Sequence, residues 1–148
     1  MHHFDHHTSL KQVESRYETA IRAIEALKKI LQEQPKYLKK FDLDLIELAA
    51  LHSELHEIYF TRLFARFEST LRGYWRTKRK KTRPMTKVLL NSIGNQRGVE
   101  ADTLEIVQEI RVYRNSLIHE ENKASRQFKL HEASRHLHKY LSRLPRKW

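Results

Sequence analysis

LIELAALHSELHEIYFTRLFARFESTL, residues 45–71, is the longest patterned stretch of the chain and decides its fold class. Its apolar residues recur every three or four positions, as one face of an α-helix requires. They are Leu45, Leu48, Leu51, Leu55, Ile58, Tyr59, Leu63, Phe67 and Leu71. No segment of the chain shows the sustained period of two that marks a β-strand. The pattern therefore predicts one long helix, which weakens near Gly73.

Apolar stripes of the same kind run through residues 13–31, 106–117 and 130–144, and a shorter candidate helix covers residues 85–93. We expect residues 1–7, MHHFDHH, to form a disordered His-rich tail. The rest of the chain, residues 8–148, has the length of a single domain. The predicted fold is all-α: an up-and-down bundle of four main helices plus one short helix.

Several helix ends are predicted from local capping residues. Pro35 stops the first helix, because the residue before a proline avoids the helical region. Gly94 is expected to supply the left-handed C-cap of the short helix. Asp102 is expected to be the N-cap of the next helix, with Glu105 three residues later as in a capping box.

The composition excludes several classes of protein. The chain has 148 residues, 39% of them hydrophobic, and a mean hydropathy of −0.74, which suits one domain with a real core. Three Gly and three Pro are too few for a turn-rich sandwich or barrel. The lack of cysteine excludes disulfide scaffolds, thiolate metal sites and cysteine nucleophiles. No apolar run approaches the roughly 18 residues of a spanning helix and no secretory h-region is visible, so we expect a cytoplasmic protein without a membrane partner.

The charge of the chain favours a polyanionic partner. Lys and Arg number 29 against 18 Asp and Glu, a net charge of +11, and nucleic acid is the first candidate. The segment RTKRKKTR concentrates six of these charges: Arg76, Lys78, Arg79, Lys80, Lys81 and Arg83. Tyr74 and Trp75 precede the segment and are rings that could stack on bases. We interpret the segment as a grip on the RNA backbone; the alternative is a solvated loop that only aids solubility.

The sharpest local feature is RVYRNSLIHEE, residues 111–121. On a helical wheel Arg114 falls inside the apolar stripe, where an unpaired guanidinium is costly to bury. Its position therefore opens onto a pocket, or Arg114 forms a purely structural pair with a carboxylate such as Glu68. His119 lies about 140° from Arg114 but only about 40° from Asn115. Cooperation between Arg114 and His119 therefore requires a distorted helix or two copies that meet in a dimer.

The run Arg114-Asn115-Ser116-Leu117-Ile118-His119 resembles the signature of HEPN domains (higher eukaryotes and prokaryotes nucleotide-binding). The stretch RFESTL, residues 66–71, looks like the acidic-aromatic turn of another HEPN helix. The resemblance implies a metal-independent endoribonuclease, often a toxin or antiviral effector, that acts as a homodimer. HEPN toxins with a nucleotidyltransferase antitoxin often carry a tyrosine two residues after the histidine. Here Glu121 stands at that position, which leaves the identity of any antitoxin or regulatory partner open.

These residue types fit metal-free RNA cleavage, in which the 2′-hydroxyl attacks the adjacent phosphate. His119 can act as base or acid, Arg114 can bind phosphate oxygens with two donors, and Asn115 can orient the histidine or hold the phosphate. Glu68 and Arg111 are predicted to support them. The expected products carry 2′,3′-cyclic phosphate and 5′-hydroxyl ends, and DNA is spared because it lacks the attacking hydroxyl.

We expect no metal and no cofactor. Four histidines of the tail form two i,i+4 pairs that could bind a transition metal only if the tail were helical: His2, His3, His6 and His7. His52 and His56 form another such pair, but no third ligand is spaced beside them. Two other functions remain open. One is a non-catalytic helical module that binds RNA or protein and keeps the motif for structure, and the other is a pure scaffold.

Overall fold

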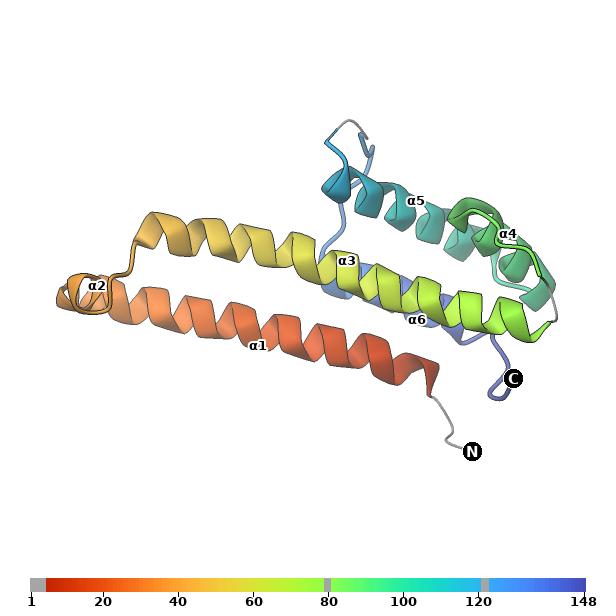
Figure 1. Cartoon of the computed structure of the whole chain (residues 1–148), viewed down its shortest axis with the longest axis horizontal. Helices are drawn as coiled ribbons and strands as arrows, with labels where there is room; N and C mark the ends of the chain where they lie inside the picture. Colours follow the sequence, from red (N-terminus) through yellow and green to blue (C-terminus); the bar gives the residue numbers. More distant parts are fainter. Residues whose placement is uncertain (1–4, 79–80, 121–122) are drawn as a thin grey trace.

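The computed structural model describes residues 5–78, 81–120 and 123–148, and every regular element in these ranges is a helix (Figure 1). In chain order the elements are α1 (His6–Glu33), α2 (Lys36–Lys40), α3 (Leu45–Thr77), α4 (Thr86–Arg97), α5 (Ala101–Ile118) and α6 (Leu130–Leu141). The all-α prediction is confirmed, and α2 is a short helix that was not predicted. None of the helices in these ranges is long and apolar enough to cross a membrane.

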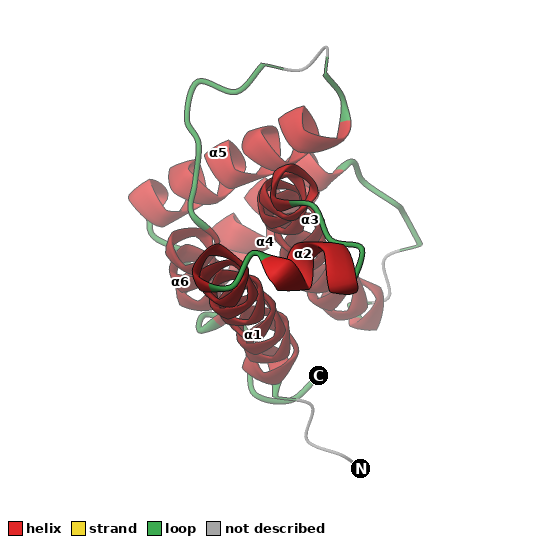
Figure 2. Ribbon diagram, turned by 90° about the vertical axis from the view of Figure 1, so that its left-hand side faces the viewer, coloured by secondary structure: helices red, strands yellow, loops and turns green. Residues whose placement is uncertain are grey.

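α1 and α3 form a long antiparallel hairpin, and α2 lies across its closed end (Figures 1 and 2). Buried apolar residues of α1 are separated by three residues or by sums of threes and fours, as in a coiled-coil seam: Leu10, Val13, Ile24 and Leu31. Tyr17, on the same stripe, packs on Tyr59 of α3 with ring centroids 5.8 Å apart. Asp5 and Asp44 each cap the start of their helix, because their carboxylates accept a backbone N–H bond from two residues further on.

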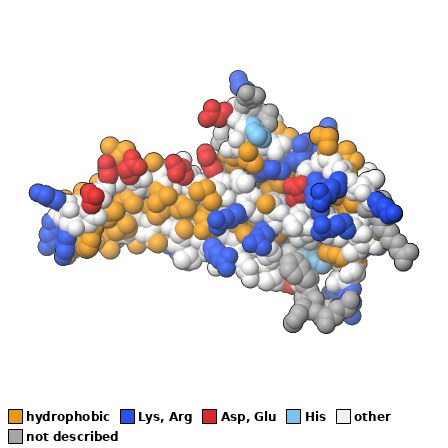
Figure 3. All heavy atoms as spheres, viewed as in Figure 1, with side chains coloured by type: hydrophobic (Ala, Val, Ile, Leu, Met, Phe, Trp, Pro, Cys, Tyr) orange, Lys and Arg blue, Asp and Glu red, His pale blue; other side chains and the backbone are white. Residues whose placement is uncertain are grey.

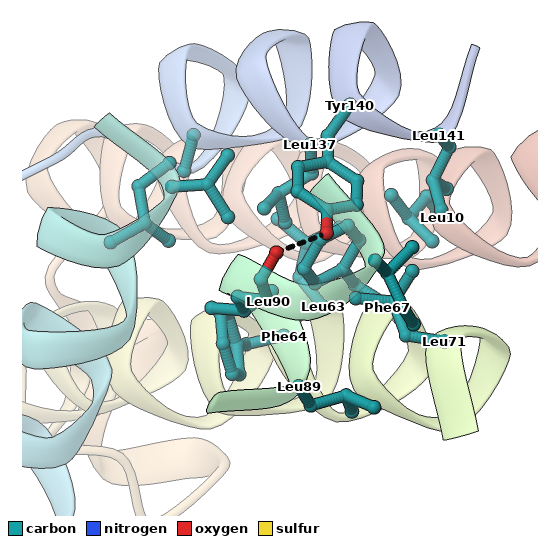
Figure 4. Packing of buried hydrophobic residues seen from close by; sticks show 14 of the residues in the cluster. Leu10, Leu63, Phe64, Phe67, Leu71, Leu89, Leu90, Leu137, Tyr140 and Leu141 are labelled. Carbon is teal, nitrogen blue, oxygen red and sulfur yellow. Dashed lines mark hydrogen bonds between the residues drawn. The ribbon is translucent and has the colours of Figure 1, made fainter. Parts of the chain in front are cut away.

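The main core lies where α4, α5 and α6 pack around the C-terminal half of α3 and the N-terminal half of α1. Figure 4 shows its centre, where Phe64 and Phe67 of α3 lie near Leu90 of α4 and Tyr140 of α6. The rings of Phe67 and Tyr140 meet edge to face, with centroids 5.3 Å apart. The Tyr140 hydroxyl donates to the Leu90 carbonyl at 2.7 Å, and burial raises the pKa of Tyr140. The opposite half of the hairpin projects away from this core (Figure 1).

Three predicted features of helix ends are wrong. α4 continues through Gly94 and ends at Gly98, whose φ of 66° supplies the left-handed cap. Gly94 instead allows α4 to approach α5 closely, since a Cβ at Gly94 would lie 3.1 Å from a methyl carbon of Leu104. Asp102 is not an N-cap but lies in the first turn of α5, where its charge still suits the helix dipole. α3 runs past Gly73 without a break.

Residues 5–7, which the sequence predicts to belong to a disordered tail, are the N-cap and first residues of α1. His6 is buried and its ring stacks on Trp148 with centroids 4.0 Å apart. Its Nε2 atom donates to a backbone carbonyl near the C-terminus at 3.0 Å. Contacts with the far end of the chain, which no local pattern reveals, therefore order the start of α1. The rest of the predicted tail, with His2 and His3, lies outside the described residues.

Candidate active site

Glu68 on α3 is the centre of a network that joins α3 to the start of α4. Its Oε1 atom accepts hydrogen bonds from Arg72 Nη2 at 2.9 Å, from Arg72 Nε at 3.1 Å and from the Thr86 hydroxyl at 2.7 Å. Arg72 also donates to the carbonyl of Pro84 at 3.1 Å. Arg72 and Thr86 were not predicted as site residues, although a glutamate and an arginine four residues apart on a helix commonly pair.

Arg114 reaches the same carboxylate from α5. Its Nη2 atom lies 3.4 Å from Glu68 Oε2, which is longer than the ~2.7–2.9 Å of a strong charge-assisted hydrogen bond. The guanidinium also lies over the Phe64 ring, 4.8 Å from its centroid, and its Nε atom is buried without a hydrogen-bond partner in the described ranges. Burial lowers the pKa of Arg114 and Glu68 opposes this effect, so the group stays cationic. The pair with Glu68, one of the two alternatives for Arg114, is present.

Arg111 lies one turn before Arg114 on α5, and with Arg72 these residues form what we term the guanidinium cluster (Arg72, Arg111 and Arg114). Arg111 Nε donates to Gln108 Oε1 at 2.8 Å. Burial and the charge of Arg114 both lower the pKa of Arg111, because the two cations are close. In the described ranges Glu68 is the one carboxylate paired with the cluster, which therefore carries excess positive charge. The nearby N-terminus of α4 has no side-chain cap and adds the positive end of its dipole.

Asn115 and His119 lie at the other end of α5. The helix runs to Ile118, and His119 follows as the C-cap with an extended backbone, φ −121° and ψ 109°. The His119 N–H donates to the Asn115 carbonyl at 2.9 Å. The His119 side chain is exposed and makes no hydrogen bond or ion pair within the described ranges. Because α5 is unbroken between them, Arg114 is held against α3 while His119 stands free, and no hydrogen bond links the two.

The predicted RNA-binding segment is described in part. Four of its six cations have exposed side chains: Arg76, Lys78, Lys81 and Arg83. Arg79 and Lys80 lie outside the described residues. Tyr74 and Trp75 are only 2% and 8% exposed, so the prediction that they stack on bases is wrong. Trp75 Nε1 instead donates to a backbone carbonyl of the segment at 3.2 Å, which ties the segment to α3.

His52 and His56, considered above as a metal-binding pair, each have another partner. His56 Nε2 lies 2.9 Å from the Tyr113 hydroxyl, and burial lowers the pKa of His56 and raises that of Tyr113. His52 Nε2 lies 3.7 Å from the Glu25 carboxylate. No group of three or more potential metal ligands is gathered anywhere in the described ranges. The His56–Tyr113 bond joins α3 to α5 just before the motif, a long-range contact that no local spacing indicates.

No family model, curated protein or solved structure matches the chain.

Proposed function

We propose that the chain is a metal-independent endoribonuclease of the HEPN type that acts as a toxin or antiviral defence effector in the cytoplasm. It cleaves RNA by attack of the 2′-hydroxyl on the adjacent phosphate and leaves 2′,3′-cyclic phosphate and 5′-hydroxyl ends. One observation carries this proposal. α5 carries two of the three arginines of the guanidinium cluster, and within the described ranges the cluster has one carboxylate partner while the motif histidine at the end of α5 is unpaired.

In this mechanism the guanidinium cluster binds the scissile phosphate. The 3.4 Å contact between Arg114 and Glu68 is long, and Arg114 Nε has no partner among the described residues, so the guanidinium can turn to a phosphate without losing a strong bond. Arg111 contributes a second cation one turn away on the same helix. The excess positive charge then stabilises the additional negative charge that the phosphorane develops in the transition state.

His119 carries the proton transfers. One imidazole takes the proton from the 2′-hydroxyl, and a second imidazole, from another copy of the chain, gives a proton to the leaving 5′-oxygen. Asn115 already holds the His119 backbone through its carbonyl. Its side-chain amide orients the His119 ring or holds a phosphate oxygen.

A homodimer is part of the proposal, because one copy keeps Arg114 against α3 and leaves His119 at the free end of α5. We propose that the two copies are related by a two-fold axis with both motifs near it, so that the two His119 residues act together. The site is therefore completed by association rather than by a bend in α5. A protein antitoxin or another regulatory protein is the remaining partner class.

RNA is the proposed ligand for reasons of charge and position. The chain carries a net charge of +11, and the basic segment at residues 76–83 joins α3 to α4. Its far end is anchored at the site, because Arg72 donates to the carbonyl of Pro84. The exposed cations of the segment can therefore hold the RNA backbone beside the guanidinium cluster, with an affinity that falls as salt rises.

A second candidate function is a non-catalytic helical module that binds RNA or protein. It is favoured by the packing of Arg114, which pairs with Glu68 and lies on the Phe64 ring as a purely structural arginine would. In this case the motif maintains the fold and His119 has no chemical role. A pure scaffold, the third possibility, predicts no RNA binding at moderate salt.

The test is incubation of the purified protein with total RNA in EDTA, beside two histidine variants. His119→Ala should abolish cleavage and leave RNA binding intact. His131→Ala removes another exposed histidine, on α6, and should cleave at the wild-type rate. Cleavage that needs a divalent ion, or products with a 5′-phosphate, would reject the mechanism. RNA binding without cleavage would support the non-catalytic module.

A further inference from the structure

One side of α3 carries an exposed stripe with helical spacing over much of the helix. We term it the α3 outer face, and its members recur every three or four residues: Glu47, Leu51, Glu54, Ile58, Arg62, Ala65 and Ser69. All seven are exposed, and the two large apolar members, Leu51 and Ile58, are 42% and 45% exposed. Buried stripes with this spacing form the seams between paired helices. The α3 outer face thus presents two large apolar side chains among charged and small ones, and no helix packs against it in the described ranges.

The charges on this face are ordered along the helix. Glu47 and Glu54 occupy the N-terminal half, Arg62 stands in the C-terminal half, and Ile58 lies between them. None of the three charged side chains has an ion-pair partner in the described ranges; the Arg62 guanidinium lies over the Tyr59 ring, 5.3 Å from its centroid. Figure 3 shows acidic side chains along the edge of the projecting half of the hairpin, beside a broad hydrophobic surface, with basic side chains at its tip and again nearer the core. The face is therefore acidic at one end and basic at the other.

The acidic end is also hollow. A groove of about 330 Å³ lies there, lined by leucines and four carboxylates: Asp42, Asp44, Glu47, Leu48, Leu51 and Glu54. In the described ranges none of these carboxylates pairs with a cation, although the chain as a whole has a net charge of +11. The groove is therefore complementary to a basic, partly apolar surface that this chain does not supply to itself.

We infer that a second copy of this chain docks on the α3 outer face, with its own α3 antiparallel and the two-fold axis at Ile58. Residues equally far from Ile58 then face each other, so that Glu54 of each copy meets Arg62 of the other. Leu51 meets Ala65 in the same way, a large side chain against a small one. Two ion pairs thus flank an apolar centre on the axis.

The order of charges selects this occupant. A uniformly acidic or uniformly basic partner would be attracted to one half of the face and repelled by the other half. A partner must instead place basic side chains opposite the acidic half and acidic side chains opposite the basic half. An antiparallel copy of α3 does so by symmetry. The basic half of the second copy, with its Arg66, also passes over the acidic groove.

The axis of this pairing lies level with the motif. Tyr113 of α5 packs on Phe60 of α3 with ring centroids 4.9 Å apart, and α5 runs antiparallel to α3. Tyr113 also bonds His56, so Ile58 lies level with the start of the motif, and Ile118 and His119 lie further along toward the N-terminal end of α3. The docking inference deepens the proposed nuclease by giving its dimer a surface, yet it rests on α3 alone and holds equally for a non-catalytic chain.

A charge-swap cycle tests the pairing. Sedimentation equilibrium at low salt, at about 1 to 100 µM chain, should show the wild type in a monomer–dimer equilibrium. Glu54→Arg and Arg62→Glu each create two like-charge pairs and should weaken the dimer about tenfold or more. The double variant Glu54→Arg/Arg62→Glu reverses both charges and should return the association constant to within about threefold of the wild type. Glu105→Arg on α5 makes the same change in net charge as Glu54→Arg and should leave association unchanged.

Circular dichroism of each variant confirms that the helices persist. A wild-type chain that stays monomeric at about 100 µM, or a double variant no better than its single parents, would overturn the inference. The cleavage assay in EDTA separates this outcome from the proposed function. If the chain is monomeric and cleaves RNA, the docking surface is refuted and the proposed nuclease stands. If the double variant restores the dimer but no RNA is cleaved, the docking surface stands and the nuclease is refuted.

Discussion

Replacing Glu68 by Gln should weaken the fold and, in the same variant, tighten RNA binding. Glu68 supplies the negative charge that Arg72 and Arg114 share, and its Oε1 atom also accepts from Thr86. Glutamine keeps the side-chain volume and one carbonyl oxygen but removes the charge. The folded state then holds neighbouring cations without a counter-charge, whereas the unfolded state leaves them in water.

The size of the loss follows from the contacts of Glu68. Hydrogen bonds to charged groups contribute about 1.5–3 kcal/mol each, and Glu68 is only 19% exposed, so solvent screens its pairs incompletely. Glutamine keeps one acceptor and such contributions are not additive, so we expect the free energy of unfolding to fall by about 2 kcal/mol. Glu109→Gln is the matched control. Its partner Arg126 lies 3.3 Å away and is 42% exposed, so the loss should stay below about 0.5 kcal/mol.

Two assays measure the opposing effects. Urea unfolding followed by circular dichroism gives the free energy of unfolding. Fluorescence anisotropy with a 2′-O-methyl RNA, which cannot be cleaved by this mechanism, gives the affinity. Removal of a negative charge beside the proposed phosphate site should raise the affinity about threefold or more at low salt.

The two directions separate a phosphate site from a structural ion pair. If stability and RNA affinity fall together in Glu68→Gln, the guanidinium cluster only maintains the fold and RNA binds elsewhere. If stability does not change, Glu68 is not the residue that holds the cluster together. Only lower stability with higher affinity agrees with a carboxylate that occupies the cluster until RNA arrives.

Three further predictions concern the motif, the basic segment and pH. Arg114→Lys should cut single-turnover cleavage about a hundredfold while RNA affinity changes little, because an ammonium keeps the charge but cannot form the two-pronged contact; a near-wild-type rate would remove Arg114 from the mechanism. Replacing residues 78–81 by Gln should make the negative slope of log affinity against log salt shallower by about three. An unchanged slope would place the phosphate contacts elsewhere. Burial lowers the pKa of His56 below its ordinary 6.5, so as pH falls the unfolded state takes up a proton before the folded state does. The free energy of unfolding should therefore decrease as pH falls below about 6.5. His56→Gln should flatten that dependence in urea unfolding, and a dependence of the same slope would assign it to other histidines.

The long helices could be predicted because their patterns are redundant. α3 repeats its apolar spacing over many turns, so no single residue decides whether the helix forms. Helix ends depend on one residue each. From the sequence, Gly94 and Gly98 are equally good C-caps. The close packing of Leu104 against Gly94 explains why Gly94 lies inside the helix. α2 has no buried residue and no side-chain cap, so its sequence shows neither an apolar stripe nor a capping residue from which the helix could be predicted.

The site could be predicted where a charge interrupts an apolar stripe. Arg114 sits among apolar neighbours on α5 and needs a carboxylate partner. Glu68 likewise lies beside the apolar stripe of α3 and supplies that carboxylate. The prediction for Tyr74 and Trp75 is wrong because the apolar stripe of α3 extends to the edge of the basic segment. Phe67 and Leu71 continue to Tyr74 and Trp75 at helical spacing, which places both rings in the core.

The placement of the motif residues bears on how activity should depend on concentration. α5 holds Arg114 at the edge of the core and places His119 at its end, so in the proposed mechanism one copy presents half of a site. If a second copy completes the site, the cleavage rate per chain should fall with dilution below the dissociation constant of the dimer, in proportion to the dimer fraction. Glu54→Arg should shift this curve to higher concentration without changing its plateau, because the residue lies on the α3 outer face and not among the motif residues. A rate per chain that stays constant from micromolar to nanomolar protein would mean that a single copy brings Arg114 and His119 together, and that the end of α5 rearranges when RNA binds.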